Sequence, residues 1–293
     1  MRSGFVAVVG RPNVGKSTLV NTIVGQKIAI TTPVPQTTRH AVRGVLHGED
    51  TQVVFLDTPG LHKPKTTLGT RLNEVARESL RDVDLVLFLV DGTAGVGAGD
   101  RFIATMLADV DTPVLAVFNK IDATGGAKQD LPQLQRLNEL GDFAEVVPVS
   151  ATTGKGLEQL VDLITARMPE GPPYFPEGQI SDQEPEQLVA EIIREKVMVQ
   201  MREEVPHSIA VEVEEMGPGE SEGVTAVHAT IFTERDSQKG IVIGKQGKGL
   251  ADIGAQARRE LELVLGSRVY LDLRVKLLKE WQRNPKYLER LGY

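Results

Sequence analysis

The chain has 293 residues, enough for about two domains, and its 41% hydrophobic and 25% charged residues are the balance of an ordinary globular protein. It contains no cysteine, which excludes a disulfide framework and a thiolate metal site. No apolar run approaches the ~20 residues that cross a bilayer, and a predicted core strand begins after Met1–Gly4, so we expect a cytoplasmic protein without a signal peptide.

Short β-branched runs alternate with helical patterns through the first half of the chain. The expected strands are Phe5–Val9, His40–Leu46, Val53–Asp57, Leu85–Val90, Val114–Phe118 and Val146–Val149. The expected helices lie near Lys16–Val24, Thr70–Leu80, Asp100–Ala108, Leu131–Leu140 and Leu157–Met168. This alternation predicts an α/β domain over residues 1–170, with a mostly parallel sheet whose ligands gather at the carboxyl ends of its strands.

The first predicted strand leads into a phosphate-binding loop. The segment fits the pattern G-x-x-x-x-G-K-[ST] and reads Gly10-Arg11-Pro12-Asn13-Val14-Gly15-Lys16-Ser17. Glycines let several backbone N–H groups point at phosphate oxygens, and the following helix presents its positive end to the same anion. We expect Lys16 to reach the β- and γ-phosphates and the Ser17 hydroxyl to bind Mg²⁺. The loop therefore predicts a nucleoside triphosphate site.

Two segments further along fit a γ-phosphate sensor. Residues 31–39 form a polar, proline-rich stretch in which a threonine hydroxyl can bind Mg²⁺ while the γ-phosphate is present; we favour Thr38, with Thr37 as the alternative. The other segment closes the strand at Val53–Asp57 and reads Asp57-Thr58-Pro59-Gly60. Its carboxylate can hold Mg²⁺, and its glycine N–H can approach the γ-phosphate. A second mobile piece is expected from Leu61 to about Leu68.

The residue after Gly60 is Leu61, where many GTPases have a glutamine that orients the attacking water. An apolar side chain cannot do this, so we expect slow intrinsic hydrolysis. We hypothesise that a potassium ion is held by the Asn13 side chain and by backbone carbonyls of the mobile loops. This ion would occupy the place where an arginine finger puts its positive charge in other GTPases. The alternative is that Asn13 is simply a turn former.

The strand at Val114–Phe118 is followed by the base-recognition motif Asn119-Lys120-Ile121-Asp122. A carboxylate at Asp122 can accept two hydrogen bonds from guanine, whereas adenine lacks that donor pair. Ser150-Ala151, after the last strand, is where a backbone N–H can meet the guanine oxygen. The combination favours GTP over ATP. The alternative from another functional class is a metabolic kinase with the same phosphate-binding loop. Such a kinase would need a site for a phosphoryl acceptor and would not need an N-K-x-D motif.

A proline- and glycine-rich stretch at 169–178 marks the boundary, and we expect a linker at 171–185. Beyond it the order changes to a helix (Glu186–Glu203), a strand (Ser208–Glu214), a strand (Thr225–Phe232), two helices flanking Gly244–Gly247, and a strand (Arg268–Leu273). This pattern predicts a small α+β domain over 186–279 with a hairpin turn at 217–220. A tail helix over 280–293 follows, interrupted near Asn284-Pro285.

The loop between those two helices has the pattern G-x-x-G with lysines, in the sequence Ile243-Gly244-Lys245-Gln246-Gly247-Lys248. Glycines allow close approach of a single-stranded sugar-phosphate backbone, and lysines supply charge. We expect a groove for bases lined by four apolar residues, Ile241, Ile243, Leu250 and Ile253. Five further basic residues are weaker candidates for phosphate contacts: Arg258, Arg259, Arg274, Lys276 and Lys279. Trp281 is expected to pack in the core.

Charge is distributed unevenly around this loop. Residues 177–234 hold 3 Lys/Arg against 14 Asp/Glu, whereas residues 235–293 hold 13 against 7, although the whole chain has a net charge of −7. A basic end favours an anionic partner, the alternative being a solvated helix face. RNA is therefore the expected partner, with a protein or membrane partner as the alternative.

Taken together, these motifs resemble the Era family of bacterial Ras-like GTPases, from about residue 4 to the closing Leu291-Gly292-Tyr293. The resemblance also covers Pro35–His40 and Asp57–His62. It implies a translation-factor-class GTPase fold joined to a type-2 KH domain. It further implies binding near the 3′ end of small-subunit ribosomal RNA and a role in small-subunit maturation. Peripheral association with the inner membrane is implied by the resemblance alone. We expect a monomer, although the sequence does not determine the oligomeric state.

Overall fold

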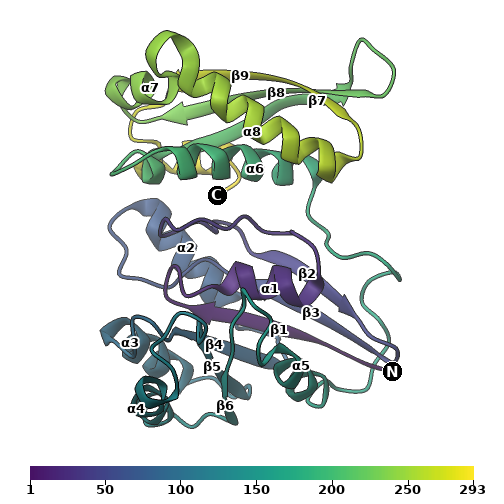
Figure 1. The fold of residues 1–293 in the computed structure, drawn as a ribbon, viewed down its shortest axis with the longest axis vertical. Coiled ribbons are helices and arrows are strands. Elements are labelled where there is room, and N and C mark those ends of the chain that lie inside the picture. Colours follow the sequence, from purple (N-terminus) through teal and green to yellow (C-terminus); the bar gives the residue numbers. More distant parts are fainter. The chain divides into compact units, whose positions relative to one another are not determined.

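The apolar runs of the first half pair into one six-stranded sheet in the order β2-β3-β1-β4-β5-β6 (Figure 1). Its strands are β1 (Arg2–Gly10), β2 (Val42–His47), β3 (Thr51–Asp57), β4 (Leu85–Asp91), β5 (Val114–Asn119) and β6 (Glu145–Pro148). The helices between them are α1 (Lys16–Val24), α2 (Thr67–Glu78), α3 (Ala98–Leu107), α4 (Ala127–Asn138) and α5 (Leu157–Thr165). Only β2 is antiparallel to its neighbour, which confirms the predicted mostly parallel α/β sheet.

The computed structural model describes residues Met1–Tyr293 and divides into two units. The first comprises Met1–Thr31, Gln36–Lys65 and Gly69–Asp182. The second comprises Gln183–Tyr293 with the short segments Thr32–Pro35 and Thr66–Leu68. None of the helices combines the length and the hydrophobicity needed to pass through a membrane.

Strands buried on both faces explain why the central runs are continuously apolar. All seven residues of β4 are buried. Along β1 the side chains alternate between two cores: Val8 packs in the core that contains Leu160 of α5, and Val9 in the core that contains Ile103 of α3. The sheet thus holds the carboxyl ends of its strands on a rigid, fully packed support.

The chain beyond α5 continues along the β2–β3 edge of the first unit. The buried Gln52 side chain accepts the backbone N–H groups of Tyr174 (2.7 Å) and Phe175 (3.0 Å) and donates to the Phe175 carbonyl (2.8 Å). The Val45 N–H donates to the carbonyl of Ile180 at 2.8 Å. Much of the stretch expected to be a linker is therefore hydrogen-bonded to the first unit, which ends at Asp182.

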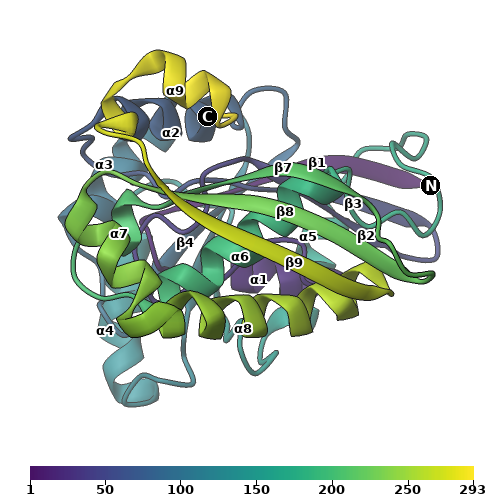
Figure 2. The same cartoon turned by 90° about the horizontal axis from the view of Figure 1, so that it is seen from above.

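The second unit has a three-stranded sheet in the order β7-β8-β9, seen with its strands side by side in Figure 2. Its elements are α6 (Pro185–Gln200), η1 (Pro206–Ser208), β7 (Ala210–Pro218), β8 (Val224–Thr233), α7 (Asp236–Ile243), η2 (Lys245–Gly247), α8 (Lys248–Leu265), β9 (Arg268–Leu277), η3 (Trp281–Arg283) and α9 (Pro285–Arg290). Helices α6 and α8 pack on one face of the sheet (Figure 1). The predicted order of elements is confirmed.

Some boundaries differ from the expected ones. Helix α4 begins at Ala127, four residues before the expected start, and includes Pro132. Strand β7 runs to Pro218, because a bulge between Val213 and Glu215 lets the pairing with β8 continue. Strand β9 extends four residues beyond the expected end, in parallel register with β8.

Candidate functional site

The phosphate-binding loop joins β1 to α1 and has a backbone that only certain residues tolerate. Asn13 and Gly15 have φ angles of 64° and 98°, the left-handed region that asparagine tolerates and glycine favours. A Cβ at Gly15 would strike the side chain of Asn119. The sequence pattern of the loop is therefore required by its own geometry.

Lys16 is folded back on this loop. Its Nζ donates to the carbonyl oxygens of Arg11 (3.1 Å) and Gly10 (3.4 Å). Burial lowers the pKa of Lys16 to about 8, and the charge of Asp57 opposes that shift. An ammonium held in this way among carbonyl oxygens is poised to exchange them for phosphate oxygens.

Three oxygen-bearing side chains meet beside Lys16. The Ser17 hydroxyl lies 2.5 Å from Asp57 Oδ2 and 2.8 Å from the Thr38 hydroxyl. Burial raises the pKa of Asp57 to about 6, although the hydrogen bond from Ser17 and the charge of Lys16 lower it. The other carboxylate oxygen, Asp57 Oδ1, is buried and accepts no hydrogen bond. This oxygen set fits a hard divalent cation such as Mg²⁺.

Gly60 and Leu61 pack directly on the phosphate-binding loop. A Cβ at Gly60 would lie 2.6 Å from the backbone nitrogen of Pro12. The Leu61 N–H donates to the Gly10 carbonyl at 3.1 Å, and its side chain is buried at 2% exposure in the core beside β1. The Thr58 hydroxyl donates to the Val8 carbonyl at 2.8 Å. The Leu61 side chain thus offers no polar group to a nucleotide, and its backbone N–H is bonded to the phosphate-binding loop.

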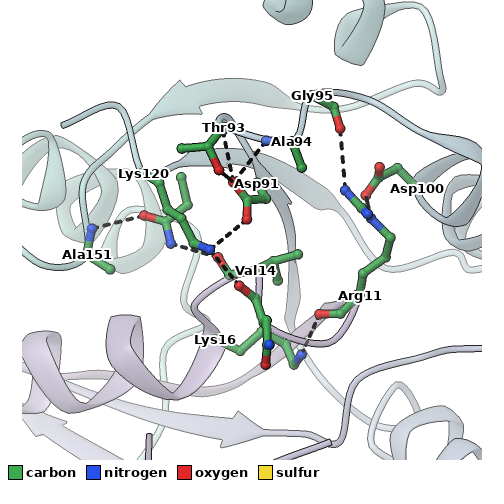
Figure 3. A network of polar contacts seen from close by, with 12 residues as sticks. Arg11, Val14, Lys16, Asp91, Thr93, Ala94, Gly95, Asp100, Lys120 and Ala151 are labelled. Carbon is green, nitrogen blue, oxygen red and sulfur yellow. Dashed lines mark hydrogen bonds and ion pairs between the residues drawn. The ribbon is translucent and has the colours of Figure 1, made fainter. Parts of the chain in front are cut away.

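The base-recognition motif is fastened to the same loop (Figure 3). The buried Asn119 amide donates to the Val14 carbonyl (2.8 Å) and accepts the N–H of Ala151 (3.0 Å). Lys120 Nζ donates to the Asn13 carbonyl at 2.7 Å. The Asp122 carboxylate is exposed. The predicted nucleotide-binding residues therefore lie at or just beyond the carboxyl ends of β1, β3, β5 and β6, with Lys16 and Ser17 forming the first turn of α1.

Two acidic residues of this network were missed by the sequence analysis (Figure 3). Asp91 pairs with Lys120 at 2.6 Å; burial alone would raise the pKa of Asp91, but the hydrogen bonds and charge of Lys120 and the Thr93 contacts hold it below its ordinary value. Asp100, fully buried, accepts from Arg11 Nε at 2.8 Å. Asp91 did carry a signal, since it ends a buried strand as Asp57 does.

The second unit presents the glycine loop at the start of α8. Gly244, Gln246 and Gly247 have φ angles of 72°, 53° and 78°, and a Cβ at Gly244 would lie 2.8 Å from the Gly249 nitrogen. Lys245, Gln246 and Lys248 are exposed. The loop thus offers backbone and lysines without bulky side chains.

A cavity of about 400 Å³ lies beside this loop, between α8 and β9. It is lined by Gly247, Leu250, Ala251, Gly254, Ala255, Arg258, Leu271 and Leu273. The small residues on α8 leave room for a flat ligand, and the leucines give it an apolar floor. Of the four apolar residues expected in the groove, Leu250 alone lines this cavity. Ile241 and Ile243 are not part of its lining, and Ile253 is fully buried in the core of the unit, so the expectation for Ile253 was wrong.

Three of the five further phosphate candidates lie on two different faces of the unit. Arg258 lines the cavity, whereas strand alternation places Arg274 and Lys276 on the face of β9 opposite Leu271 and Leu273. There Arg274 pairs with Asp272 and Lys276 with Glu214. Trp281 is fully buried and donates to the Ser208 carbonyl at 2.9 Å, which agrees with a packing role.

Comparisons with known proteins match both units. A family model described as a 50S ribosome-binding GTPase matches residues 5–120, and a KH domain model matches residues 204–282. GTPase Era of Streptomyces coelicolor is 49% identical over 302 aligned positions, which cover 100% of this chain and 95% of that protein. GTPase Era of Heliobacterium modesticaldum is 48% identical over 293 positions, covering 100% and 97%.

A solved structure extends the likeness to the fold. The crystal structure of Era in complex with MgGDPNP and nucleotides 1506–1542 of 16S ribosomal RNA has a TM-score of 0.97 to this chain. Its sequence is 43% identical, and the match covers 100% of this chain and 99% of that one. With a phosphate-binding loop, a guanine motif and a glycine loop in matching places, this chain belongs to the Era family of GTPases.

Proposed function

We propose that this chain is a GTP-hydrolysing switch that binds small-subunit ribosomal RNA near its 3′ end and assists maturation of the small subunit. The observation that carries the proposal is the full-length match to an Era bound to MgGDPNP and that RNA region. The exposed Lys245 and Lys248, beside a cavity with an apolar floor, provide the chemistry for a single strand.

Crosslinking in cells, followed by sequencing of the bound RNA, tests this function. The expected reads lie at the 3′ end of the small-subunit RNA, and the Lys245→Ala, Lys248→Ala double variant should lose them. Arg268→Ala, which removes an exposed charge outside the loop, is the matched control. Recovery of a protein partner without RNA would favour the alternative, a C-terminal unit that docks on protein or membrane.

At the nucleotide site, Ser17, Thr38 and Asp57 hold Mg²⁺, which neutralises charge on the phosphates when bound. The Thr38 hydroxyl lies 2.8 Å from that of Ser17, which favours Thr38 over Thr37 as the ligand. Lys16 binds the β- and γ-phosphates, and the Gly60 N–H donates a hydrogen bond to the γ-phosphate when GTP is bound. The backbone of residues 10–17 cradles the phosphate chain.

Asp122, with Asn119, Lys120, Ser150 and Ala151, selects the guanine base. The Asp122→Asn variant replaces an acceptor with an amide donor, so it should bind GTP at least about 100-fold more weakly. Xanthosine triphosphate, which has a carbonyl in place of the 2-amino group, should bind this variant better than GTP does. An unchanged preference for GTP would remove Asp122 from the proposed site.

Hydrolysis is slow, because Leu61 is buried and apolar, and a potassium ion at Asn13 raises its rate. The position of Asn13 in the loop supports this assignment, while its left-handed φ of 64° also suits a turn former. Rates measured in potassium and in sodium buffers separate the two. A potassium stimulation that Asn13→Gly abolishes is expected, and equal rates in both salts would contradict the potassium role.

A further inference from the structure

The loops that carry Thr38 and Gly60 are joined by a side-chain contact that no nucleotide motif requires. Gln36, two residues before Thr38, has its Nε2 at 2.7 Å from Nε2 of His62, which lies two residues after Gly60. Gln36 has a left-handed φ of 64°, so the backbone turns there to aim this amide. The contact therefore connects the two segments expected to respond to the γ-phosphate.

The other nitrogen of the His62 ring fixes the direction of these hydrogen bonds. His62 Nδ1 lies 3.0 Å from the Gly60 carbonyl oxygen, which can only accept. In the neutral ring Nδ1 must carry the hydrogen, so Nε2 accepts from the Gln36 amide. Both ring nitrogens are thus engaged, and the ring holds Gly60 rather than activating water.

A buried asparagine holds the backbone of the same residue. Asn73 of α2, 8% exposed, donates from Nδ2 to the His62 carbonyl at 2.7 Å and accepts the His62 N–H on Oδ1 at 3.3 Å. Gly69 of the same helix leaves room for the ring, because a Cβ there would lie 3.3 Å from His62 Nε2. His62 is therefore fixed to α2 through its backbone and to Gln36 through its side chain.

We propose that Gln36, His62 and Asn73 form an interswitch latch that holds the Thr38 and Gly60 segments together for hydrolysis. The three act as positioning residues, since their contacts are with Gly60 and with one another. The latch rests on the GTPase activity assigned above. Misplacement of a positioned group by about 1 Å can cost up to about 100-fold in rate, so a loose latch lowers the rate without removing a nucleotide contact.

A double-mutant cycle in the full-length protein tests the latch. Gln36→Ala and His62→Ala should each lower single-turnover GTP hydrolysis about tenfold, while GDP affinity changes by less than about twofold. The double variant should lose about tenfold and not a hundredfold, because the second substitution finds the contact already broken. Lys63→Ala, the exposed neighbour of His62, should retain the rate of the unchanged protein.

Hydrogen exchange supplies a readout that general damage would not mimic. With a non-hydrolysable GTP analogue bound, His62→Ala should speed exchange in residues 36–39, although the substitution lies on the other segment. If His62→Ala fails to fold, the reciprocal experiment replaces it. Gln36→Ala should then speed exchange around Gly60, although this substitution lies on the Thr38 segment. Additive losses, or single variants with the full rate, would overturn the latch. An unchanged protein that does not hydrolyse GTP would instead count against the proposed function.

Discussion

Asp57 is a carboxylate whose surroundings oppose its charge. Burial raises its pKa to about 6 from an ordinary 3.8, even with Ser17 and Lys16 lowering it. Because the folded pKa lies above the unfolded one, the associated stability is fully present below about pH 4 and is lost as the pH rises through about 6. In the ligand-free protein the buried charge should therefore cost about 3 kcal/mol at neutral pH.

Asp57→Asn should accordingly raise the free energy of unfolding of the nucleotide-free, metal-free protein. The gain should approach about 3 kcal/mol at pH 7.5 and fall to about half of that at pH 5. Urea titrations at the two pH values measure it. The same variant should lose Mg²⁺-dependent GTP affinity, because the buried oxygen is needed for the cation. A gain independent of pH would show that the charge of Asp57 is not the cause.

Gly60 has no space for a side chain. A Cβ would lie 2.6 Å from the Pro12 nitrogen and 2.7 Å from its Cα, and backbone atoms cannot move aside as a flexible side chain can. Gly60→Ala should therefore displace the phosphate-binding loop, lowering GTP-analogue affinity more than GDP affinity and hydrolysis at least about tenfold. Titrations with fluorescent nucleotides measure both affinities. Gly240→Ala, where a Cβ meets nothing within 4 Å, is the control and should bind both nucleotides normally.

At the scale of elements, helix α3 is tied to the phosphate-binding loop by one carboxylate. Asp100 Oδ2 accepts the Gly97 N–H at 2.8 Å at the start of α3, and Oδ1 accepts from Arg11. Asp100→Ala removes a cap and a hydrogen bond to a charged group, so the unfolding free energy should fall by about 2 kcal/mol. Arg101→Ala, at the exposed next position, should change it little. Equal stability of the two variants in thermal melts would contradict the tie.

The elements that could be predicted from the sequence are those with a local cause. The strand before Gly10 and the helix after Ser17 follow from apolar runs and from the loop pattern between them. The Arg11–Asp100 and Lys120–Asp91 pairs join residues that are 89 and 29 positions apart, and no spacing rule connects such partners. His62 shows the same limit, because its contacts with Gln36 and Asn73 arise only once the sheet has brought three segments together.

At the scale of the whole molecule, the sequence predicts a nucleotide-binding unit followed by an RNA-binding unit. It is less informative about the residue at which the first unit ends. The proline-rich stretch at 169–178 reads as a linker, since proline and glycine interrupt helices. Its attachment to the first unit depends on Gln52, whose amide satisfies three backbone groups of Tyr174 and Phe175. Nothing in the sequence around Gln52 indicates that its side chain holds a segment more than 120 residues away. A boundary assigned from composition therefore marks where regular structure stops rather than where a folded unit stops.

A switch that acts on RNA must obey reciprocity between its two ligands. If the GTP-bound form changes RNA affinity by some factor, RNA must change the preference for GTP over GDP by the same factor. We expect a factor of about 5 to 150, measured with an oligonucleotide of the small-subunit RNA 3′ end and with GDP or a non-hydrolysable GTP analogue. Replacing Lys245 and Lys248 by alanine should weaken RNA binding in both nucleotide states. RNA affinities that are identical with the two nucleotides would leave a GTPase and an RNA-binding unit on one chain without a switch between them.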